Sequence, residues 1–516
     1  MLVSDIVRRN ARYFGNMDAV VVPAGVTRTW AELDARTDKL ANALLSLGLA
    51  KGERLAMYAP NCSEYIDFFF ACAKSGVIGA ALNTRLAPNE TSAYLSYVEP
   101  TVALVHVDLV EAARTWLAEV PSVKHVIGFG GEHGLDFDLQ TLIDSASTTA
   151  PVTQLTEDDM YMLGATSGTT GIPKAAILTH GNAIAALQNW AAELALPEAG
   201  TALQCIPYFF NPGGPAGLHP VLLKGGRTVV PTAFDPVELP KLVQNYRVTH
   251  TIIVPTMVQM VVSQPGVESY DLSSLLGVMS GGSPFPASVL KRAREVMGDV
   301  FNPIYGMAES YSCGTILRPQ NLFSEGTEQQ LRQLGSIGKP ETLMDVRVVD
   351  AEGNDVPHDG ITSGEILLSG PSMSPGYFRM PEETERCRLG KWFRTGDVAV
   401  VDAEGFITIV DRLKDMIITG GINVFSIEVE RVLEQHPDVA MVAVIGLPHP
   451  QWGEAIHAVV VRREGGTVTP PELMDFAAER LASYKKPRSL ELVDSLPVSA
   501  TGKVLKKQLR AQRGIA

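Results

Sequence analysis

The hydrophobic positions of the chain follow two spacings that alternate along its N-terminal half. Residues 29–47 carry Trp30, Leu33, Leu40 and Leu44 at roughly helical intervals, and Gly48 stands where that helix should end. Other stretches are short apolar runs typical of buried strands, at residues 54–59, 101–106, 201–207, 249–254 and 276–280. Because these strands recur between helical stretches, the pattern predicts an α/β fold with mainly parallel sheets covered by helices.

The pattern changes after about residue 340. Short strands separated by glycine, aspartate and proline turns predict a small β-subdomain, at residues 345–350, 364–369 and 406–410. A compact mixture of helices and strands then begins near residue 415. It has helices at 426–436 and 470–484 and strands at 439–445 and 456–463. We therefore predict a large N-terminal domain of βα subdomains over residues 1–411 and a small α+β C-terminal domain over 412–516.

Charge and composition exclude several classes of protein. The net charge of −14 argues against a nucleic-acid-binding protein, because such proteins need clustered Lys and Arg to replace phosphate counterions. The most apolar stretch, residues 65–82, is interrupted by Asp67 and Lys74, which favours a buried helix, turn and strand over an integral membrane span. Five widely spaced cysteines without a CxxC pair, and an N-terminus without a secretory apolar region, indicate a cytoplasmic location.

The segment at residues 166–174, which reads TSGTTGIPK, has the composition of a phosphate-binding loop. Its glycines let backbone N–H groups converge on an anion, four hydroxyl groups add donors, and a lysine adds a positive charge. A flexible surface turn would also explain a Ser/Thr/Gly cluster, but the segment follows a strand-like run at 160–165. The GxxxxGK[ST] pattern of a Walker loop is not satisfied.

Further short motifs follow this loop in a fixed order. They are SGGSP at 280–284, YGMAE at 305–309, WFRTGD at 392–397, DRLKD at 411–415, GGINV at 420–424 with Glu428, and TGK at 501–503. The ordered set covers nearly the whole chain and resembles the acyl-adenylate-forming superfamily, in particular its branch of AMP-dependent acid–CoA ligases. This resemblance implies ATP, Mg²⁺ and coenzyme A as cofactors, and a small carboxylic acid as substrate.

The resemblance also implies a role for each matched residue. The catalytic residues are Lys503, Glu309 and Lys174, and Mg²⁺ is held by Glu309 and Thr166. Coenzyme A is bound at Gly420 and Gly421, and the mobile C-terminal domain turns about a hinge at Lys414. The residues that bind ATP or AMP are Thr166, Ser167, Gly168, Thr169, Thr170, Gly171, Lys174, Gly282, Ser283, Tyr305, Gly306, Met307, Ala308, Asp397, Arg412 and Lys503.

Each of these residue types suits its implied role, although each also has an ordinary structural explanation. Tyr305 offers a face on which adenine can stack, or is a core tyrosine. Glu309 is a hard oxygen ligand for Mg²⁺, or a surface carboxylate. Asp397 can accept hydrogen bonds from both ribose hydroxyls, or belongs to a turn. Lys503 can stabilise charge that develops between carboxylate and α-phosphate, or belongs to an exposed basic tail.

Three departures from the family pattern bear on the substrate. Ala308 replaces a threonine whose hydroxyl usually contacts phosphate, which should weaken activity by about 0.5–1.5 kcal/mol without abolishing it. Phe210 stands where many acyl-CoA synthetases carry histidine, so no histidine gate is expected. Asn211 stands where amino-acid-activating domains carry aspartate, which disfavours an ammonium-bearing substrate. His219 could contact the substrate, but we expect it to be a hydrogen-bonded structural histidine.

The predicted acyl pocket is apolar and has no Arg or Lys to hold a second carboxylate. Its residues are Tyr208, Phe210, Asn211, Gly213, Gly214, Met257, Gly281 and Met307. We expect Gly213, Gly214 and Gly217 to leave space for substrate. The sequence thus predicts that a hydrophobic monocarboxylic acid, fatty or bulky and cyclic, becomes a CoA thioester through an acyl-AMP. Alternatives are an acyl-AMP ligase that loads an acyl carrier protein, a luciferase-type oxygenase and a catalytically silent binding protein. A homodimer is also considered.

Overall fold

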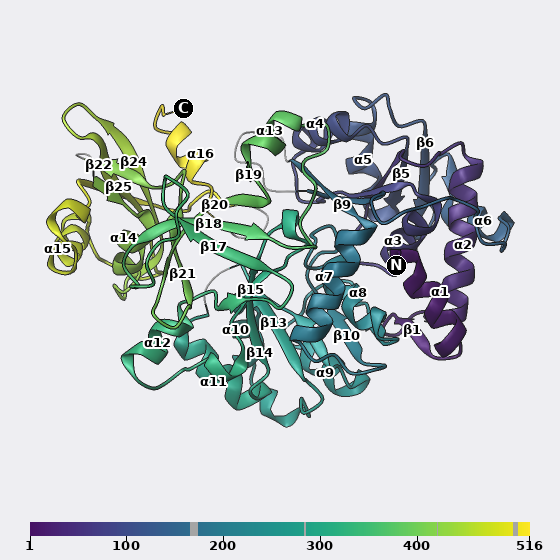
Figure 1. Cartoon of the computed structure of the whole chain (residues 1–516), viewed down its shortest axis with the longest axis horizontal. Helices are drawn as coiled ribbons and strands as arrows, with labels where there is room; N and C mark the ends of the chain where they lie inside the picture. The colour runs from purple at the N-terminus through teal and green to yellow at the C-terminus, as the bar shows by residue number, and fades with distance from the viewer. Residues whose placement is uncertain (166–173, 283–284, 420–421, 499–503, 516) are drawn as a thin grey trace. The chain divides into compact units, whose positions relative to one another are not determined.

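The computed structural model describes residues 1–165, 174–282, 285–419, 422–498 and 504–515 (Figure 1). The chain divides into two compact units. The first comprises Met1–Val346 and Leu368–Phe393, and the second comprises Arg347–Leu367 and Arg394–Ala516. This division passes through the small β-sheet, whereas the hinge predicted at Lys414 lies inside the second unit. The domain boundary predicted at residue 411 stays a prediction.

A seven-stranded sheet lies in the N-terminal part of the first unit, within the described residues. Its order is β7-β6-β5-β3-β4-β8-β9, parallel throughout except for the antiparallel pair β8 and β9. The strands are β3 (Arg54–Tyr58), β4 (Ile78–Ala81), β5 (Val102–His106), β6 (His125–Phe129), β7 (Phe137–Asp138), β8 (Met160–Ala165) and β9 (Ala175–Thr179). The helices are α2 (Trp30–Ser46), α3 (Glu64–Ser75), α4 (Pro88–Val98), α5 (Val110–Leu117) and α6 (Leu139–Ser145).

The predicted helix at 29–47 is α2, and its first turn shows why it begins there. The Thr29 side chain accepts a hydrogen bond from the Glu32 N–H, and the Glu32 carboxylate accepts one from the Thr29 N–H at 2.8 Å. This reciprocal capping box satisfies backbone donors that a helix otherwise leaves unpaired.

The second sheet of this unit has nine strands in the described residues, in the order β16-β15-β14-β13-β12-β10-β11-β1-β2. Strands β14 to β1 are parallel, and the edges are antiparallel. The strands are β1 (Asp18–Val21), β2 (Thr27–Thr29), β10 (Thr201–Gln204), β11 (Arg227–Val229), β12 (His250–Ile252), β13 (Gly277–Gly281), β14 (Phe301–Gly306), β15 (Gly314–Ile316) and β16 (Lys339–Pro340). The accompanying helices are α1 (Val3–Phe14), α7 (His180–Glu193), α8 (Pro215–Leu223), α9 (Glu238–Tyr246), α10 (Pro255–Val262), α11 (Ala287–Met297) and α12 (Glu328–Leu334).

The small β-subdomain predicted after residue 340 is present. Its sheet has the order β17-β18-β20-β19, with β21 paired to β20, and α13 (Pro381–Arg386) precedes β19. The strands are β17 (Asp345–Val349), β18 (Ser363–Ser369), β19 (Arg388–Leu389), β20 (Trp392–Val401) and β21 (Ile407–Arg412).

The C-terminal part of the second unit forms a separate α+β body with its own core. Its sheet has the order β23-β22-β25-β24, and β26 pairs with β25 in parallel. Its elements are β22 (Ile417–Thr419), β23 (Ile422–Val424), α14 (Ser426–Leu433), β24 (Val439–His449), β25 (Gly453–Arg462), α15 (Pro470–Arg480), β26 (Ser489–Val493) and α16 (Lys506–Ala511). Helix α14 begins at the predicted Ser426, and both helices end earlier than predicted.

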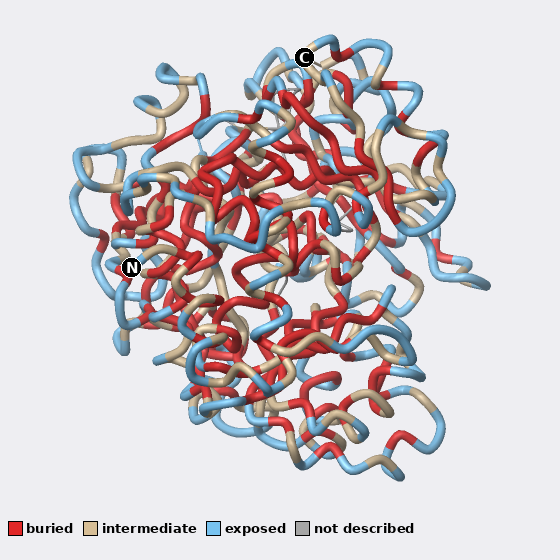
Figure 2. Tube along the Cα trace, turned by 90° about the vertical axis from the view of Figure 1, so that its right-hand side faces the viewer, coloured by how far each residue is buried: buried red, intermediate tan, exposed pale blue. Residues whose placement is uncertain are grey.

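The apolar stretch 65–82 is a buried helix and strand, as predicted. Figure 2 shows buried segments inside each part of the chain and exposed segments at its outside. Lys74 is buried in α3, where its Nζ binds Asp34 at 2.6 Å and Asp38 at 2.8 Å. Because a buried charge needs a partner, these carboxylates explain how α3 keeps a lysine within an apolar run. Among the described residues, no helix is both long and apolar enough to cross a membrane.

Candidate active site

The predicted phosphate-binding loop connects β8 to β9. Residues 166–173 of the loop lie outside the described residues, including Thr166, Ser167, Gly168, Thr169, Thr170 and Gly171. The strands on either side form an antiparallel pair in which Ala165 lies opposite Ala175. Ala165 and Ala175 therefore lie at one end of the sheet, and Lys174 stands directly before β9.

Lys174 belongs to a cluster of charged and aromatic side chains in the first unit. Its Nζ pairs with the Glu383 carboxylate of α13 and lies 5.0 Å from the centroid of the Tyr377 ring. The Tyr377 hydroxyl donates a hydrogen bond to Glu309 Oε1 at 2.6 Å. Two predicted catalytic residues, Lys174 and Glu309, are thus joined through Tyr377.

Backbone contacts fix Tyr377 in this place. Tyr377 forms a β-bridge with Ala176 of β9, and the Phe378 N–H donates to the Ala175 carbonyl at 2.8 Å. Burial, followed by the charge of Glu309, raises the pKa of the Tyr377 phenol well above its usual value. The phenol therefore stays protonated and holds one oxygen of a carboxylate that is itself buried. Lys174 lowers the pKa of Glu383.

This cluster fits a Mg²⁺·phosphate site. Glu309 offers a hard oxygen ligand whose direction Tyr377 fixes, and Lys174 offers a charge for phosphate. Within the described ranges, no group of three or more His, Cys, Asp or Glu side chains could cage a metal. Mg²⁺ commonly takes one or two carboxylates and completes its shell with water and substrate phosphates, so a single buried carboxylate is sufficient.

Tyr377→Phe should raise the Mg²⁺ concentration for half-maximal adenylation by about tenfold, because a hydrogen bond to a charged group contributes about 1.5–3 kcal/mol. Acid-dependent ATP–pyrophosphate exchange measured across a Mg²⁺ titration tests this. The matched control is Tyr97→Phe, which removes a hydroxyl that donates to the Phe378 carbonyl instead. An equal shift in both variants, or none in either, would contradict the role assigned to Tyr377.

The predicted adenine-binding segment lies at the carboxyl ends of two neighbouring parallel strands. Gly281 ends β13, Tyr305 and Gly306 end β14, and Gly281 lies opposite Ile304. In open α/β sheets, ligands bind beyond these strand ends. Gly306 is required sterically, since a Cβ there would lie 2.2 Å from the Ser312 carbonyl oxygen. Ser283 lies outside the described residues.

The residues after Gly306 turn back toward the β8–β9 end. Glu309 lies in the 3₁₀-helix Ala308–Ser310, preceded by the half-buried Met307. A Cβ built at Gly164 of β8 would lie 3.7 Å from the Ala308 Cβ, an ordinary contact. Ala308 thus lies beside β8, the strand that precedes the predicted phosphate loop. A threonine at this position would place its hydroxyl beside that strand, and Ala308 lacks this hydroxyl.

The structure corrects part of the predicted acyl pocket. A Cβ at Gly213 would lie 2.3 Å from the Pro207 carbonyl oxygen, and one at Gly214 equally close to that of Tyr208. These glycines therefore permit a tight turn and do not leave space for substrate. Tyr208 is fully buried with its ring 5.7 Å from that of Tyr65, as in a core tyrosine.

The other predicted acyl residues are more accessible. Phe210, Asn211 and Met257 are half-buried, and Asn211 Nδ2 donates to Ser312 Oγ at 3.4 Å. His219 is fully buried, with its ring stacked on Phe70 at 5.1 Å. Burial lowers the pKa of His219 to about 3. Neither ring nitrogen has a hydrogen-bond partner in the described part of the chain, so the expectation of a hydrogen-bonded histidine is wrong.

The second unit brings together the two residues predicted to contact ribose. Asp397 of β20 lies opposite Arg412 of β21, and Arg412 Nε pairs with Asp397 Oδ1 at 2.7 Å. Asp397 is buried and Arg412 is exposed. The pair thus presents an oriented carboxylate, and Lys414 follows it by two residues on an exposed stretch.

Ion pairs fix the C-terminal helix to the segment around Lys414. Lys506 Nζ binds Glu430 Oε1 at 2.7 Å and donates to Ser426 Oγ at 2.6 Å, and Ser426 Oγ in turn donates to Asp411. Arg510 pairs with Asp415 at 2.9 Å. Helix α16 starts three residues after Lys503 in the sequence. Lys503 itself and the pair Gly420 and Gly421 lie outside the described residues.

Comparisons with known proteins show the family of the chain. Residues 7–378 match the model of the AMP-binding enzyme family, and residues 428–503 match that of the AMP-binding enzyme C-terminal domain. A feruloyl-CoA synthase of Amycolatopsis sp is 37% identical over 95% of both chains. A fatty acid–[acyl-carrier-protein] ligase of Streptomyces coeruleorubidus is 31% identical over 95% of this chain and 92% of its own. ATP-bound MatB from Rhodopseudomonas palustris superposes with a TM-score of 0.86, at 27% identity over 99% of both chains.

These matches cover nearly the whole chain. The chain belongs to the AMP-binding enzyme family of adenylate-forming ligases. Within that family it is an acyl-CoA synthetase, which uses ATP and coenzyme A to convert a carboxylic acid to a thioester. The predicted fold class, family and enzyme class are confirmed.

Proposed function

We propose that the substrate is a monocarboxylic acid with a hydrophobic body, fatty or bulky and cyclic. The main support for this proposal is the absence of positively charged side chains from the predicted acyl site. The segments at 207–219, 257–260 and 304–307 contain no Arg or Lys that could pair with a second carboxylate. Two relatives with similar sequences are named for ferulic and fatty acids, which supports the same class.

The proposed reaction has two steps. In the first, a carboxylate oxygen attacks the α-phosphorus of ATP, and the bond to the departing pyrophosphate breaks. Residues 166–171 and Lys174 hold the phosphates, Glu309 and Thr166 hold Mg²⁺, and Lys503 stabilises charge at the α-phosphate. Bound Mg²⁺ neutralises phosphate charge. In the second, the thiolate sulfur of coenzyme A attacks the acyl carbon and AMP leaves.

In the structure, Lys174 already has an ion-pair partner that would compete with phosphate. Its ammonium pairs with Glu383, so a phosphate that binds Lys174 must displace that carboxylate.

The other substrate groups have their own residues in the proposed reaction. Asp397 and Arg412 contact the ribose. Adenine lies against Tyr305 between Gly282 and Met307, and the pantetheine arm of coenzyme A passes Gly420 and Gly421. We also propose that the enzyme works in the cytoplasm, because its five cysteines are free thiols and thiols stay reduced there.

Pyrophosphate release measured over a panel of acids tests the substrate class. Fatty and aryl monocarboxylic acids should be converted and dicarboxylic or amino acids should not. A dicarboxylic acid as the best substrate would overturn the proposal. Free coenzyme A and a carrier-protein phosphopantetheine are compared as acceptors, since a relative is named for the latter. Light scattering on the same sample tests for a homodimer.

A further inference from the structure

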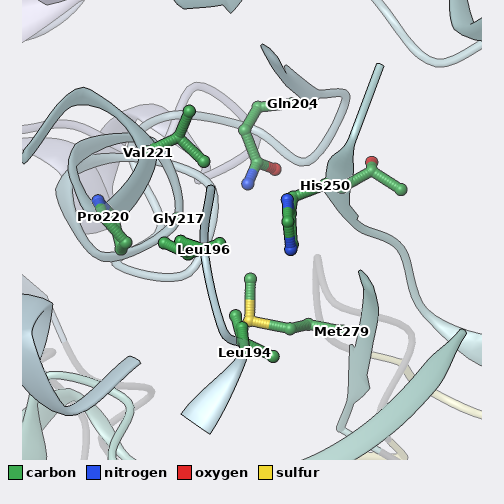
Figure 3. Close-up of a pocket in the computed structure, with 9 residues that line it drawn as sticks. Leu194, Leu196, Gln204, Gly217, Pro220, Val221, His250 and Met279 are labelled. Carbon is green, nitrogen blue, oxygen red and sulfur yellow. The ribbon is translucent and has the colours of Figure 1, made fainter. Parts of the chain in front are cut away.

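The pocket between α8 and strands β10, β12 and β13 is part of the packed core (Figure 3). Gln204, His250 and Met279 point into it from the three strands, and the described residues that line it leave no room even for a water molecule. Chemistry of the first unit that still lacks a role lies instead at α13, where a carboxylate neutralises Lys174.

Glu383 of α13 lies between two positive charges, one on each carboxylate oxygen. Its Oε2 pairs with Lys174 Nζ, and its Oε1 pairs with Nη1 of Arg386, three residues further along the helix. The hydrogen bond from Lys174 lowers the pKa of Glu383, so the carboxylate is ionised at neutral pH. The side chains of Lys174 and Glu383 are 18% and 25% exposed, so water and salt screen the pair only in part.

The backbone that carries Glu383 is held in place by contacts other than this ion pair. The Tyr377 N–H donates to Thr384 Oγ1 at 2.9 Å, and that hydroxyl donates to the Met380 carbonyl at 2.9 Å. Helix α13 is thus fixed to the turn that contains Tyr377. Glu383 can therefore rotate away from Lys174 while the helix stays where it is.

A carboxylate resembles a phosphate in the two properties that an ammonium recognises, negative charge and acceptor oxygens. A phosphate of ATP or pyrophosphate that binds Lys174 must displace Glu383 or lie beside a like charge, and both are unfavourable. Arg386 lowers the cost of displacement, because Glu383 keeps one cation after it leaves Lys174. The carboxylate therefore weakens phosphate binding without blocking it.

We propose that Glu383 is an internal competitor, which occupies the ammonium of Lys174 whenever ATP and pyrophosphate are absent. The same contact weakens the binding of both ligands, and the return of Glu383 to Lys174 helps pyrophosphate to leave after acyl-adenylate formation. Because the carboxylate opposes the bound phosphates in the ground state and in the transition state alike, its effect falls on the KM for ATP. This inference rests on the proposed role of Lys174 in phosphate binding.

Glu383→Gln tests the inference, because it keeps the shape of the side chain and removes its charge. The KM for ATP and the inhibition constant of pyrophosphate against ATP should both fall by about fivefold. Initial rates of CoA-thioester formation at varied ATP and pyrophosphate measure both constants. The matched control is Glu385→Gln, which removes the same charge from an exposed position of the same helix and should leave both constants unchanged.

A double-mutant cycle with Lys174→Met separates this inference from the proposed function. Lys174→Met alone should raise the KM for ATP by about tenfold or more, and Glu383→Gln should have no further effect in that background. If Lys174→Met leaves the KM for ATP unchanged, the phosphate-binding role of Lys174 is refuted. If Lys174→Met raises it but Glu383→Gln raises it too, or changes neither constant, the inference is overturned.

Two further outcomes bear on the inference. An equal fall of both constants in Glu385→Gln would overturn it, since the effect would then come from the overall charge of α13. Glu383→Asp keeps the charge but shortens its reach, so it should lower both constants by about twofold. This second variant decides the matter if Glu383→Gln does not fold, and unchanged constants in it would then overturn the inference.

Discussion

Lys503→Ala should lower the rate of acyl-adenylate formation by about 10²–10³-fold and leave thioester formation from supplied acyl-AMP nearly unchanged. Negative charge grows between the carboxylate and the α-phosphate only in the first step, and an ammonium aimed there stabilises that transition state. The second step breaks an acyl–phosphate bond, and the proposed reaction assigns the lysine no part in it. Acid-dependent ATP–pyrophosphate exchange measures the first step, and single-turnover thioester formation measures the second.

The control for this experiment is Lys507→Ala. Lys507 is exposed at the start of α16, four residues beyond Lys503, so its removal takes away an equal charge from the same basic tail. If the tail acts only through its overall charge, the two variants will lose adenylation equally. A specific loss in Lys503→Ala, with α16 still anchored by Lys506 and Arg510, supports a catalytic lysine.

Gly421→Leu should have the opposite effect, slowing thioester formation from acyl-AMP by about 100-fold while sparing adenylation. A branched side chain on the proposed pantetheine path would displace the thiol, and a misplacement of about 1 Å can cost that much. Gly421 itself lies outside the described residues. Gly421→Ala should show a smaller loss. Equal damage to both half-reactions in Gly421→Leu would falsify the division of labour between the two steps.

The sequence predicted the elements of the fold well where the signal is local. Thr29 and Glu32 start α2, where both capping partners lie within one turn. Ser426 is the first residue of α14, but Phe425 occupies the N-cap position and the Ser426 hydroxyl donates to Asp411, so the prediction that Ser426 caps this helix is wrong. Helix ends were less accurate: the helix expected to reach residue 484 ends at Arg480, where Leu481 adopts an extended conformation. Periodicity continues past a helix end whenever the next residues still face the core, so it does not locate that end.

The sequence identified individual residues of the candidate site, but it did not show which of these side chains contact each other. Lys174 and Glu309 were identified from their motifs, whereas Tyr377 was not, because its partner Glu309 is 68 residues away. A Gly-Tyr pair in the sequence carries no sign of that contact. Likewise, Gly213 and Gly214 suggested open space, but the carbonyl oxygens that fill it come from residues 207 and 208 of a folded turn.

The sequence by itself determined the enzyme class and the α/β alternation, because ordered motifs and hydrophobic spacing are written in neighbouring residues. Only the tertiary structure decided which side chains meet: Tyr377 with Glu309 and Lys174, His219 between two phenylalanines, and Gln204 with His250 around one pocket. These contacts depend on strand order and register, which bring distant segments to one face of a sheet, and no local pattern encodes them.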